Sequence, residues 1–136
     1  MKRKKIMDNH LDKIFVFGSN ESGHHGAGAA LYAVNRKGAR MHQGFGPAGD
    51  SFAIPTKDWR IGNLDLLSIN IYINAFIRYA NIRPNIKFQV TAIGCGLAGF
   101  KNHDIAPLFK DAPKNCYFPK EWEPFLPGKN IWGTFE

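Results

Sequence analysis

The sequence predicts an α/β protein with a mixed sheet between helices. Short β-branched or aromatic runs alternate with helix-like segments along the chain, which is typical of this class. Two of these runs, residues 14–17 and 90–93, lead directly into glycine-rich loops. Glycines let a backbone approach a ligand, and loop amides and a following helix N-terminus supply partial positive charge. Two such loops in one small domain indicate a cleft that holds both ends of a diphosphate.

Length and composition fit one globular domain. With 136 residues, 44% hydrophobic and 21% charged, the chain can bury roughly two-thirds of its unfolded surface and fold without disulfides. We expect residues 13–136 to form this domain, with a proline-rich C-terminal tail. Residues 1–12 are expected to be a basic, mobile N-terminal segment.

The net charge of +7 is concentrated at the N-terminus, where five of the 18 basic residues lie within the first 13 positions. Without the four basic residues at positions 2–5 the net charge is +3, an ordinary value for a small domain. Such a head is usually solvated, but association with nucleic acid through it stays open as a secondary hypothesis.

No secretory signal follows the basic head, because Asp8, His10 and Asp12 interrupt any apolar stretch. No run approaches about 18 apolar residues, so we expect no membrane span. Cys95 and Cys116 form no disulfide framework, and a reduced, cytoplasmic protein is the simplest interpretation.

The first half of the chain predicts two strands and one helix. Residues 13–17 form a strand, and residues 26–35 form an alanine-rich helix that opens from the first loop and ends at Gly38. Residues 39–50 are turn material with room for a short strand, and residues 51–56 form the second strand.

The clearest helix covers residues 64–83, with Asn63 as its N-cap and Pro84 just beyond its end. Its apolar residues recur at intervals of three and four, which places them on one face. They are Leu66, Ile69, Ile73, Phe76, Ile77 and Ala80. Residues 87–93 then predict a third strand, and residues 103–109 a short helix. Four prolines predict a mostly extended or irregular tail from residue 112.

Residues 94–99 match GxGxxG after a strand, but no acidic residue follows about 20 positions later, so the dinucleotide-binding Rossmann pattern is not met. Residues 44–49 match the same letters, yet they follow no strong strand and open no helix, so they predict turns. A P-loop is not indicated, because the chain has no GxxxxGK followed by Ser or Thr.

Four further candidates are weaker. Adjacent His24 and His25 cannot easily face one ion, and no second pair has ligand spacing, so we expect polar loop residues and no metal or cofactor. Cys95 is a candidate nucleophile without an identified base, and a small residue filling a tight loop is the simpler interpretation. Lys57 ends a strand, where α/β proteins place functional groups, although spacing alone favours a surface lysine.

The three tryptophans are expected to pack in the core or at its rim rather than to stack on a ligand. They are Trp59, Trp122 and Trp132.

Three segments occur in a fairly specific order, with the long helix between the second and the third. They are residues 17–29 around the first loop, residues 54–60 (Ile-Pro-Thr-Lys-Asp-Trp-Arg) and residues 93–100 around the second loop. In this combination the chain resembles a macro domain, the ADP-ribose-binding module. More narrowly, it is similar to the branch of terminal ADP-ribose glycohydrolases and DNA ADP-ribosyl-glycohydrolase antitoxins, in a minimal form expected in bacteria or their phages.

The resemblance implies a three-layer α/β/α fold with a mixed central sheet. The first loop would hold the distal ribose, the second would clasp the diphosphate, and Phe100 would lie near that ribose. Lys57 matches the lysine that attacks the anomeric carbon of the ribose. The implied ligand-binding residues are Gly18, Ser19, Asn20, Gly26, Ala27, Gly28, Gly94, Cys95, Gly96, Leu97, Ala98, Gly99 and Phe100.

The chain departs from the family pattern at two places. Ala98 stands where the glycohydrolase with the closest second loop has a catalytic aspartate. An acid that resolves a lysyl adduct would then come from another carboxylate, and the candidates are Asp50, Asp58 and Asp104. The adenine-reading acidic residue lies before the first loop in the family, where this chain offers only Asp8 and Asp12.

The leading hypothesis is therefore a domain that binds ADP-ribose, a related NAD-derived nucleotide or an ADP-ribosylated substrate. It would hydrolyse an ADP-ribosyl bond or remove a phosphate from the ribose end. The alternative is a non-catalytic binding module for the same nucleotide, and the second alternative is a nucleic-acid-associated accessory protein that uses the basic head.

Overall fold

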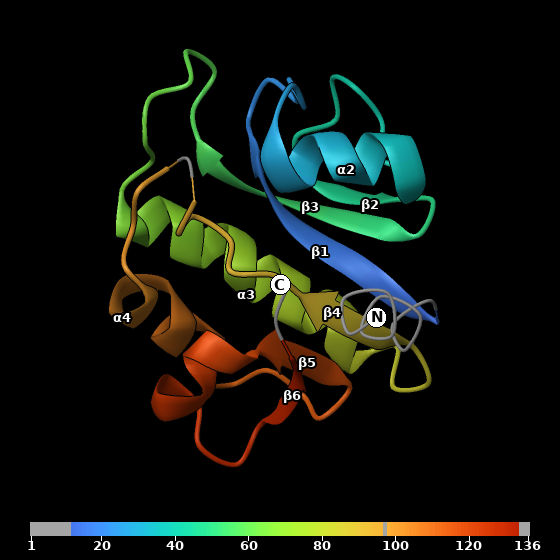
Figure 1. Cartoon of the computed structure of the whole chain (residues 1–136), viewed down its shortest axis with the longest axis vertical. Helices are drawn as coiled ribbons and strands as arrows, with labels where there is room; N and C mark the ends of the chain where they lie inside the picture. The colour runs from blue at the N-terminus through green and yellow to red at the C-terminus, as the bar shows by residue number, and fades with distance from the viewer. Residues whose placement is uncertain (1–11, 97, 134–136) are drawn as a thin grey trace.

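The computed structural model describes residues 12–96 and 98–133, so the basic head and Leu97 lie outside it. The strands are β1 (Lys13–Asn20), β2 (Gly46–Ala48), β3 (Ser51–Lys57), β4 (Lys87–Val90), β5 (Cys116–Pro119) and β6 (Asn130–Gly133). The α-helices are α2 (Gly28–Arg36), α3 (Leu66–Asn81) and α4 (Asn102–Ile105), and the 3-10 helices are η1 (Ala106–Phe109) and η2 (Lys120–Phe125) (Figure 1). In the described part of the chain, no helix combines the length and apolarity needed to cross a bilayer.

The strands form one mixed sheet in the order β2-β3-β1-β4-β5-β6, which confirms the predicted α/β class with a mixed sheet. Only β2 runs antiparallel to its neighbour, and the other four pairings are parallel. Strand β1 lies between β3 and β4, with Asn20 paired to Lys57 and Val16 paired to Val90. The carboxyl ends of β1, β3 and β4 therefore share one edge of the sheet.

Alternating side chains of β1 serve two separate hydrophobic clusters, as the period of two in a strand requires. Phe15 and Phe17 pack with Ala33 of α2, whereas Val16 packs in the larger cluster with Ile73 of α3. Both sets are buried, so β1 is covered on its two faces by different helices.

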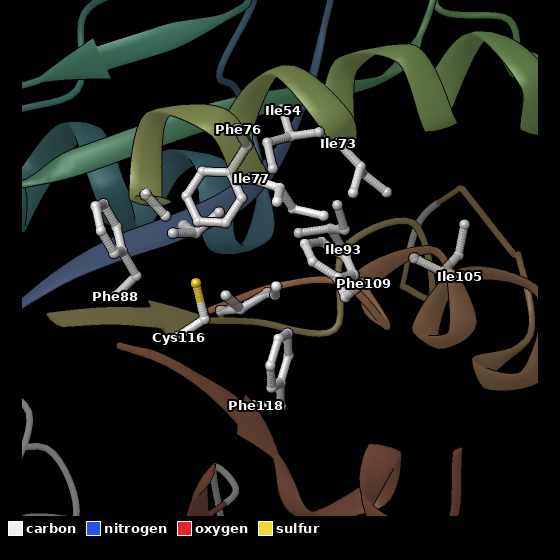
Figure 2. Packing of buried hydrophobic residues seen from close by; sticks show 14 of the residues in the cluster. Ile54, Ile73, Phe76, Ile77, Phe88, Ile93, Ile105, Phe109, Cys116 and Phe118 are labelled. Carbon is white, nitrogen blue, oxygen red and sulfur yellow. The ribbon is translucent and has the colours of Figure 1, made fainter. Parts of the chain in front are cut away.

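Aromatic rings dominate the larger cluster. The ring of Phe76 on α3 lies 5.0 Å from that of Phe52, 5.3 Å from that of Phe88 and 6.3 Å from that of Phe109, centroid to centroid. Figure 2 shows Phe76, Phe88 and Phe109 converging from α3, β4 and η1. These edge-to-face contacts join the long helix to both halves of the sheet.

The long helix is shorter than predicted and has a different cap. Helix α3 begins at Leu66, and the carboxylate of Asp65 accepts a hydrogen bond of 2.8 Å from the Ser68 amide. The prediction of Asn63 as N-cap is wrong, because its side chain donates to the carbonyl oxygen of Ala98 instead. Of the six apolar residues expected on one face, Leu66 is 37% exposed and the other five are buried.

The tail was expected to be mostly extended or irregular, and its extended parts are ordered strands, because the tail adds β5 and β6 to the sheet. The prolines of the tail do not prevent short elements. Pro119 is the last residue of β5, and Pro124 lies inside η2. The amide of Asn115 donates to the carbonyl oxygens of Ala80, Arg83 and Ile86, at 3.1, 3.0 and 2.8 Å, and so attaches the tail to the end of α3.

The substitution Phe76→Ala is expected to lower the free energy of unfolding by about 3–5 kcal/mol, because it empties a fully buried site where little can collapse. Leu67→Ala on the same helix is the control, since Leu67 is 72% exposed and its loss should change stability by about 0.5 kcal/mol or less. Urea denaturation measures both, and equal effects would contradict the central role of Phe76.

Candidate functional site

The first glycine-rich loop is organised by Asn20 at the end of β1. Its side-chain nitrogen donates to the His24 carbonyl oxygen at 2.9 Å, and its side-chain oxygen accepts from the His24 amide at 2.9 Å and the Ser22 hydroxyl at 2.8 Å. The amide group of Asn20 is therefore used within the loop. Its role in the structure is to fix the loop backbone.

A second segment and helix α3 brace this loop from outside. A Cβ atom at Gly44 would collide with the carbonyl oxygens of Asn20 and Glu21, so the backbones lie too close for a side chain. The Tyr72 hydroxyl on α3 donates to the Glu21 carboxylate at 2.6 Å. That hydrogen bond and partial burial raise the pKa of Tyr72 to about 12.

His25 is a structural residue of the loop. Its ring is buried, packs edge-on against Phe17 at 5.3 Å and places Nε2 3.0 Å from the Gln43 carbonyl oxygen. Burial lowers the pKa of His25, against the opposing effect of the backbone groups of Gln43 and Arg40. The imidazole is therefore held neutral, and it ties the first loop to the 40–43 segment.

Helix α2 opens from this loop with a free N-terminus. Its N-cap is Ala27, which provides no side-chain cap, and the first turn contains no acidic residue. The structure records no acceptor, among the residues it describes, for the N–H groups of Gly28, Ala29 and Ala30. Unsatisfied amides and the helix dipole make this end attractive to an anion.

Lys57 lies at the end of β3, directly beside the end of β1. The two strands pair Lys57 with Asn20, and the Lys57 carbonyl oxygen accepts a 2.9 Å hydrogen bond from the Glu21 amide. The side chain is half-buried, and within the described ranges no group forms a hydrogen bond or ion pair with its ammonium.

The second glycine-rich loop follows β4, which ends at Val90 rather than at residue 93 as predicted. Beyond Val90, the Thr91 amide and hydroxyl both bond to the Val16 carbonyl oxygen, and the loop turns away at Gly94 with φ of +75°. A Cβ atom at Gly96 would meet no atom of the described chain within 4 Å, so the loop leaves open space there.

These elements surround one cavity of about 700 Å³, which is within the usual range for a small-molecule site. Its lining includes ten of the implied site residues: Gly18, Ser19, Asn20, Gly26, Ala27, Gly28, Lys57, Gly94, Gly96 and Ala98. Cys95, Gly99 and Phe100 are not among the lining residues, and Leu97 lies outside the described chain. Among the described lining residues, only His24 and Lys57 have ionisable side chains, and none is a carboxylate.

Sequence reasoning missed other parts of this lining. Ile61 and Thr91 lie outside the three motif segments, and Thr56 lies in the 54–60 segment without an assigned role, yet all three line the cavity. His24 was considered for metal binding with His25, but the two rings have different surroundings. The described part of the chain holds no group of three or more potential metal ligands.

Cys95 has no sign of activation. Burial raises the pKa of its thiol to about 11, so the nucleophilic thiolate is disfavoured at neutral pH. Cys116 is buried in the core and burial raises its pKa to about 12 (Figure 2).

The expected packing of Trp122 and Trp132 is confirmed, because both are buried, but it is wrong for Trp59, which is 70% exposed. The Asp58 carboxylate accepts from the amides of Arg60 and Gly62, at 2.8 and 2.9 Å, and closes a tight loop that leaves Trp59 exposed. The sequence alone did not indicate this turn, which directs Trp59 away from the core.

None of the three acidic substitutes considered for the missing aspartate lines the cavity. Asp50 precedes β3, at the end of that strand opposite Lys57. The carboxylate of Asp58 is engaged in its own loop, and that of Asp104 accepts from the Lys101 amide at 3.1 Å.

Asp12 is also far from the cavity. It precedes β1 at the end opposite Asn20, and seven residue steps of strand separate the two ends by about 23 Å. Its carboxylate lies 3.5 Å from the Lys13 ammonium and 3.8 Å from that of Lys87. Asp12 therefore cannot read a base bound at the cavity, and Asp8 lies outside the described residues.

The fold and the cavity define an α/β protein with a glycine-lined cleft at the carboxyl ends of parallel strands, and the lining residues that the structure describes include no carboxylate. Comparison of the chain with protein-family models, with curated proteins and with solved structures gave no match.

His25 is expected to make stability pH-dependent. Because its pKa in the folded protein lies below the unfolded value of about 6.5, the unfolded chain takes up a proton that the folded chain does not. The stabilisation is thus present above pH 6.5 and is lost as the pH falls below that value.

The measurement is urea denaturation of the wild type between pH 8 and about pH 5. His25→Gln should be less stable at pH 8 and should lose part of the acid-side slope. His103→Gln is the control, since His103 is exposed and contacts only a neighbouring carboxylate. An unchanged slope in His25→Gln would assign the pH dependence to other groups.

Proposed function

We propose that this protein binds ADP-ribose, or a closely related NAD-derived nucleotide, in the cavity at the carboxyl ends of β1, β3 and β4. The observation that carries this proposal is that the uncapped N-terminus of α2 and the second glycine-rich loop open into the same cavity. The described lining residues include one lysine and no carboxylate.

A diphosphate suits this electrostatic arrangement. The first-turn residues of α2, Gly28, Ala29 and Ala30, line one side, and Gly94 and Gly96 line another. Each anion at a helix N-terminus is typically stabilised by about 0.3–1 kcal/mol, more when water is excluded. Oxygen atoms of a diphosphate can accept from both sets of amides without any charged side chain in the loops.

The choice of ADP-ribose among diphosphates rests on the resemblance to macro domains. The three-layer α/β/α arrangement of macro domains is part of this proposal. The three segments that carry the resemblance are spread over residues 17–100, and all of them contribute lining residues to one cavity. The pairing of Asn20 with Lys57 also supports it, because it puts the candidate lysine beside the loop that would hold the distal ribose.

Within this function, Lys57 is the candidate nucleophile for hydrolysis of an ADP-ribosyl bond. Its ammonium has no competing partner among the described residues, and an amine at this position is the nucleophile that such a reaction needs. A second candidate function is a binding module without turnover. It is favoured by Ala98 and by the lack of a carboxylate in the described lining.

Calorimetric titration with ADP-ribose is expected to show micromolar binding, and Gly96→Ala should weaken it about tenfold, or 1.4 kcal/mol. The reason is that the added methyl group enters open cavity space, where it displaces ligand without disturbing the fold. Gly62→Ala is the control, since Gly62 lies outside the lining and a Cβ there has ordinary contacts. Absence of ADP-ribose binding by the wild type would overturn the proposed ligand.

Lys57→Ala should retain ADP-ribose binding within about tenfold and abolish turnover, because the nucleophile is removed but the loop amides remain. Mass spectrometry of ADP-ribosylated peptide and oligonucleotide substrates measures release of ADP-ribose. Lys110→Ala, at an exposed lysine outside the cavity lining, controls for loss of charge. Unchanged turnover in Lys57→Ala would remove Lys57 from the mechanism.

A further inference from the structure

The two adjacent histidines of the first loop differ in what their rings contact. His25 is buried and bonded to the Gln43 carbonyl oxygen, whereas His24 is exposed and lines the cavity. The structure records no partner for either ring nitrogen of His24 among the residues it describes. This imidazole is therefore free to exchange protons with a bound molecule or with water.

The loop holds His24 in place through its backbone. Asn20 binds both the amide and the carbonyl group of His24, each at 2.9 Å. The ring then lies against Gly26, where a Cβ atom would come within 3.0 Å of Nε2. A side chain at position 26 would crowd the imidazole, so Gly26 leaves the space in which the ring sits beside the cavity.

Other acids near the cavity are directed elsewhere. Glu21 follows Asn20 directly, but its carboxylate accepts from the Tyr72 hydroxyl on α3. Asp58 follows Lys57 directly, but its carboxylate binds amides of its own loop. His24 is thus the side chain besides Lys57 that can carry a proton at the described cavity wall.

We propose that His24 is the proton donor and acceptor of an ADP-ribosyl hydrolase reaction at Lys57, in place of the carboxylate that Ala98 lacks. This inference rests on the proposed function. Histidine suits the role because an imidazolium can donate a proton and a neutral imidazole can accept one.

The proposed reaction balances as follows. The neutral Lys57 amine attacks the anomeric carbon of the ribose and forms a C–N bond, while the bond from that carbon to the leaving group breaks. The leaving group takes a proton from the His24 imidazolium. A water molecule then gives a proton to neutral His24. The oxygen of the resulting hydroxide forms a bond to the anomeric carbon. The C–N bond breaks, which regenerates the neutral amine and the imidazolium.

The test compares wild type with His24→Gln in single-turnover release of ADP-ribose from an ADP-ribosylated oligonucleotide or peptide. His24→Gln should keep ADP-ribose affinity within about threefold and slow release by about 100-fold or more. It should also lose one limb of the pH–rate profile of the wild type. His103→Gln, an exposed histidine outside the cavity lining, should match the wild type in rate and pH profile.

An NMR titration provides a readout besides activity. ADP-ribose should shift the imidazole signals of His24 and leave those of His103 unchanged. Matching melting temperatures of wild type and His24→Gln will show that the exposed substitution leaves the fold intact.

The outcomes separate the two proposals. No ADP-ribose binding by the wild type would overturn the proposed function and this inference with it. Binding without turnover of either substrate would overturn the inference and leave the binding module. Turnover with an unchanged rate and pH profile in His24→Gln would overturn the inference alone, and so would a loss of affinity as large as the loss of rate.

Discussion

The parallel pairing of β1 with β3 on one side and β4 on the other is the constraint on which the site depends. It brings three loops, far apart in sequence, to one edge of the sheet. The pairing is held by side chains that alternate between two clusters, so a slip of one residue would turn Phe15 and Phe17 toward the wrong helix. The register that places Asn20 beside Lys57 is thus set by the core.

The charge of the cavity follows from where carboxylates are directed. Glu21 and Asp58 flank the two strand ends, yet the first binds a hydroxyl on α3 and the second binds loop amides. Both negative charges are thereby satisfied away from the lining, and the uncapped end of α2 remains attractive to an anion. Backbone amides then add positive potential to the charge of Lys57, and the small residues of the loops let the backbone lie at the cavity surface.

The core-forming elements could be predicted from sequence because their apolar periodicity is strong, as in α3 and β1. The cap of α3 could not, since Asn63 and Asp65 are equally good caps by type and only the Ala98 carbonyl removes Asn63. The two strands of the tail could not be located within its extended or irregular sequence, because β5 and β6 are short and gain stability from pairing that the local pattern does not contain. The glycine-rich loops could be recognised in the sequence. The difference between exposed His24 and buried His25 could not, because it depends on the packing of His25 against Phe17.

The two glycine-rich loops contribute different side chains to the cavity. The hydrogen bond from the Asn63 side chain to the Ala98 carbonyl oxygen joins the 58–63 loop to the second glycine-rich loop on one side of the cavity. Ala98 contributes a methyl group there, and Gly94 and Gly96 contribute no side chain. Among the described lining residues, proton transfer by a side chain must therefore come from Lys57 or from His24 of the first loop. Asn20 fixes the backbone of this exposed histidine. Asn20 therefore both fixes the backbone of the first loop and determines where the His24 imidazole lies.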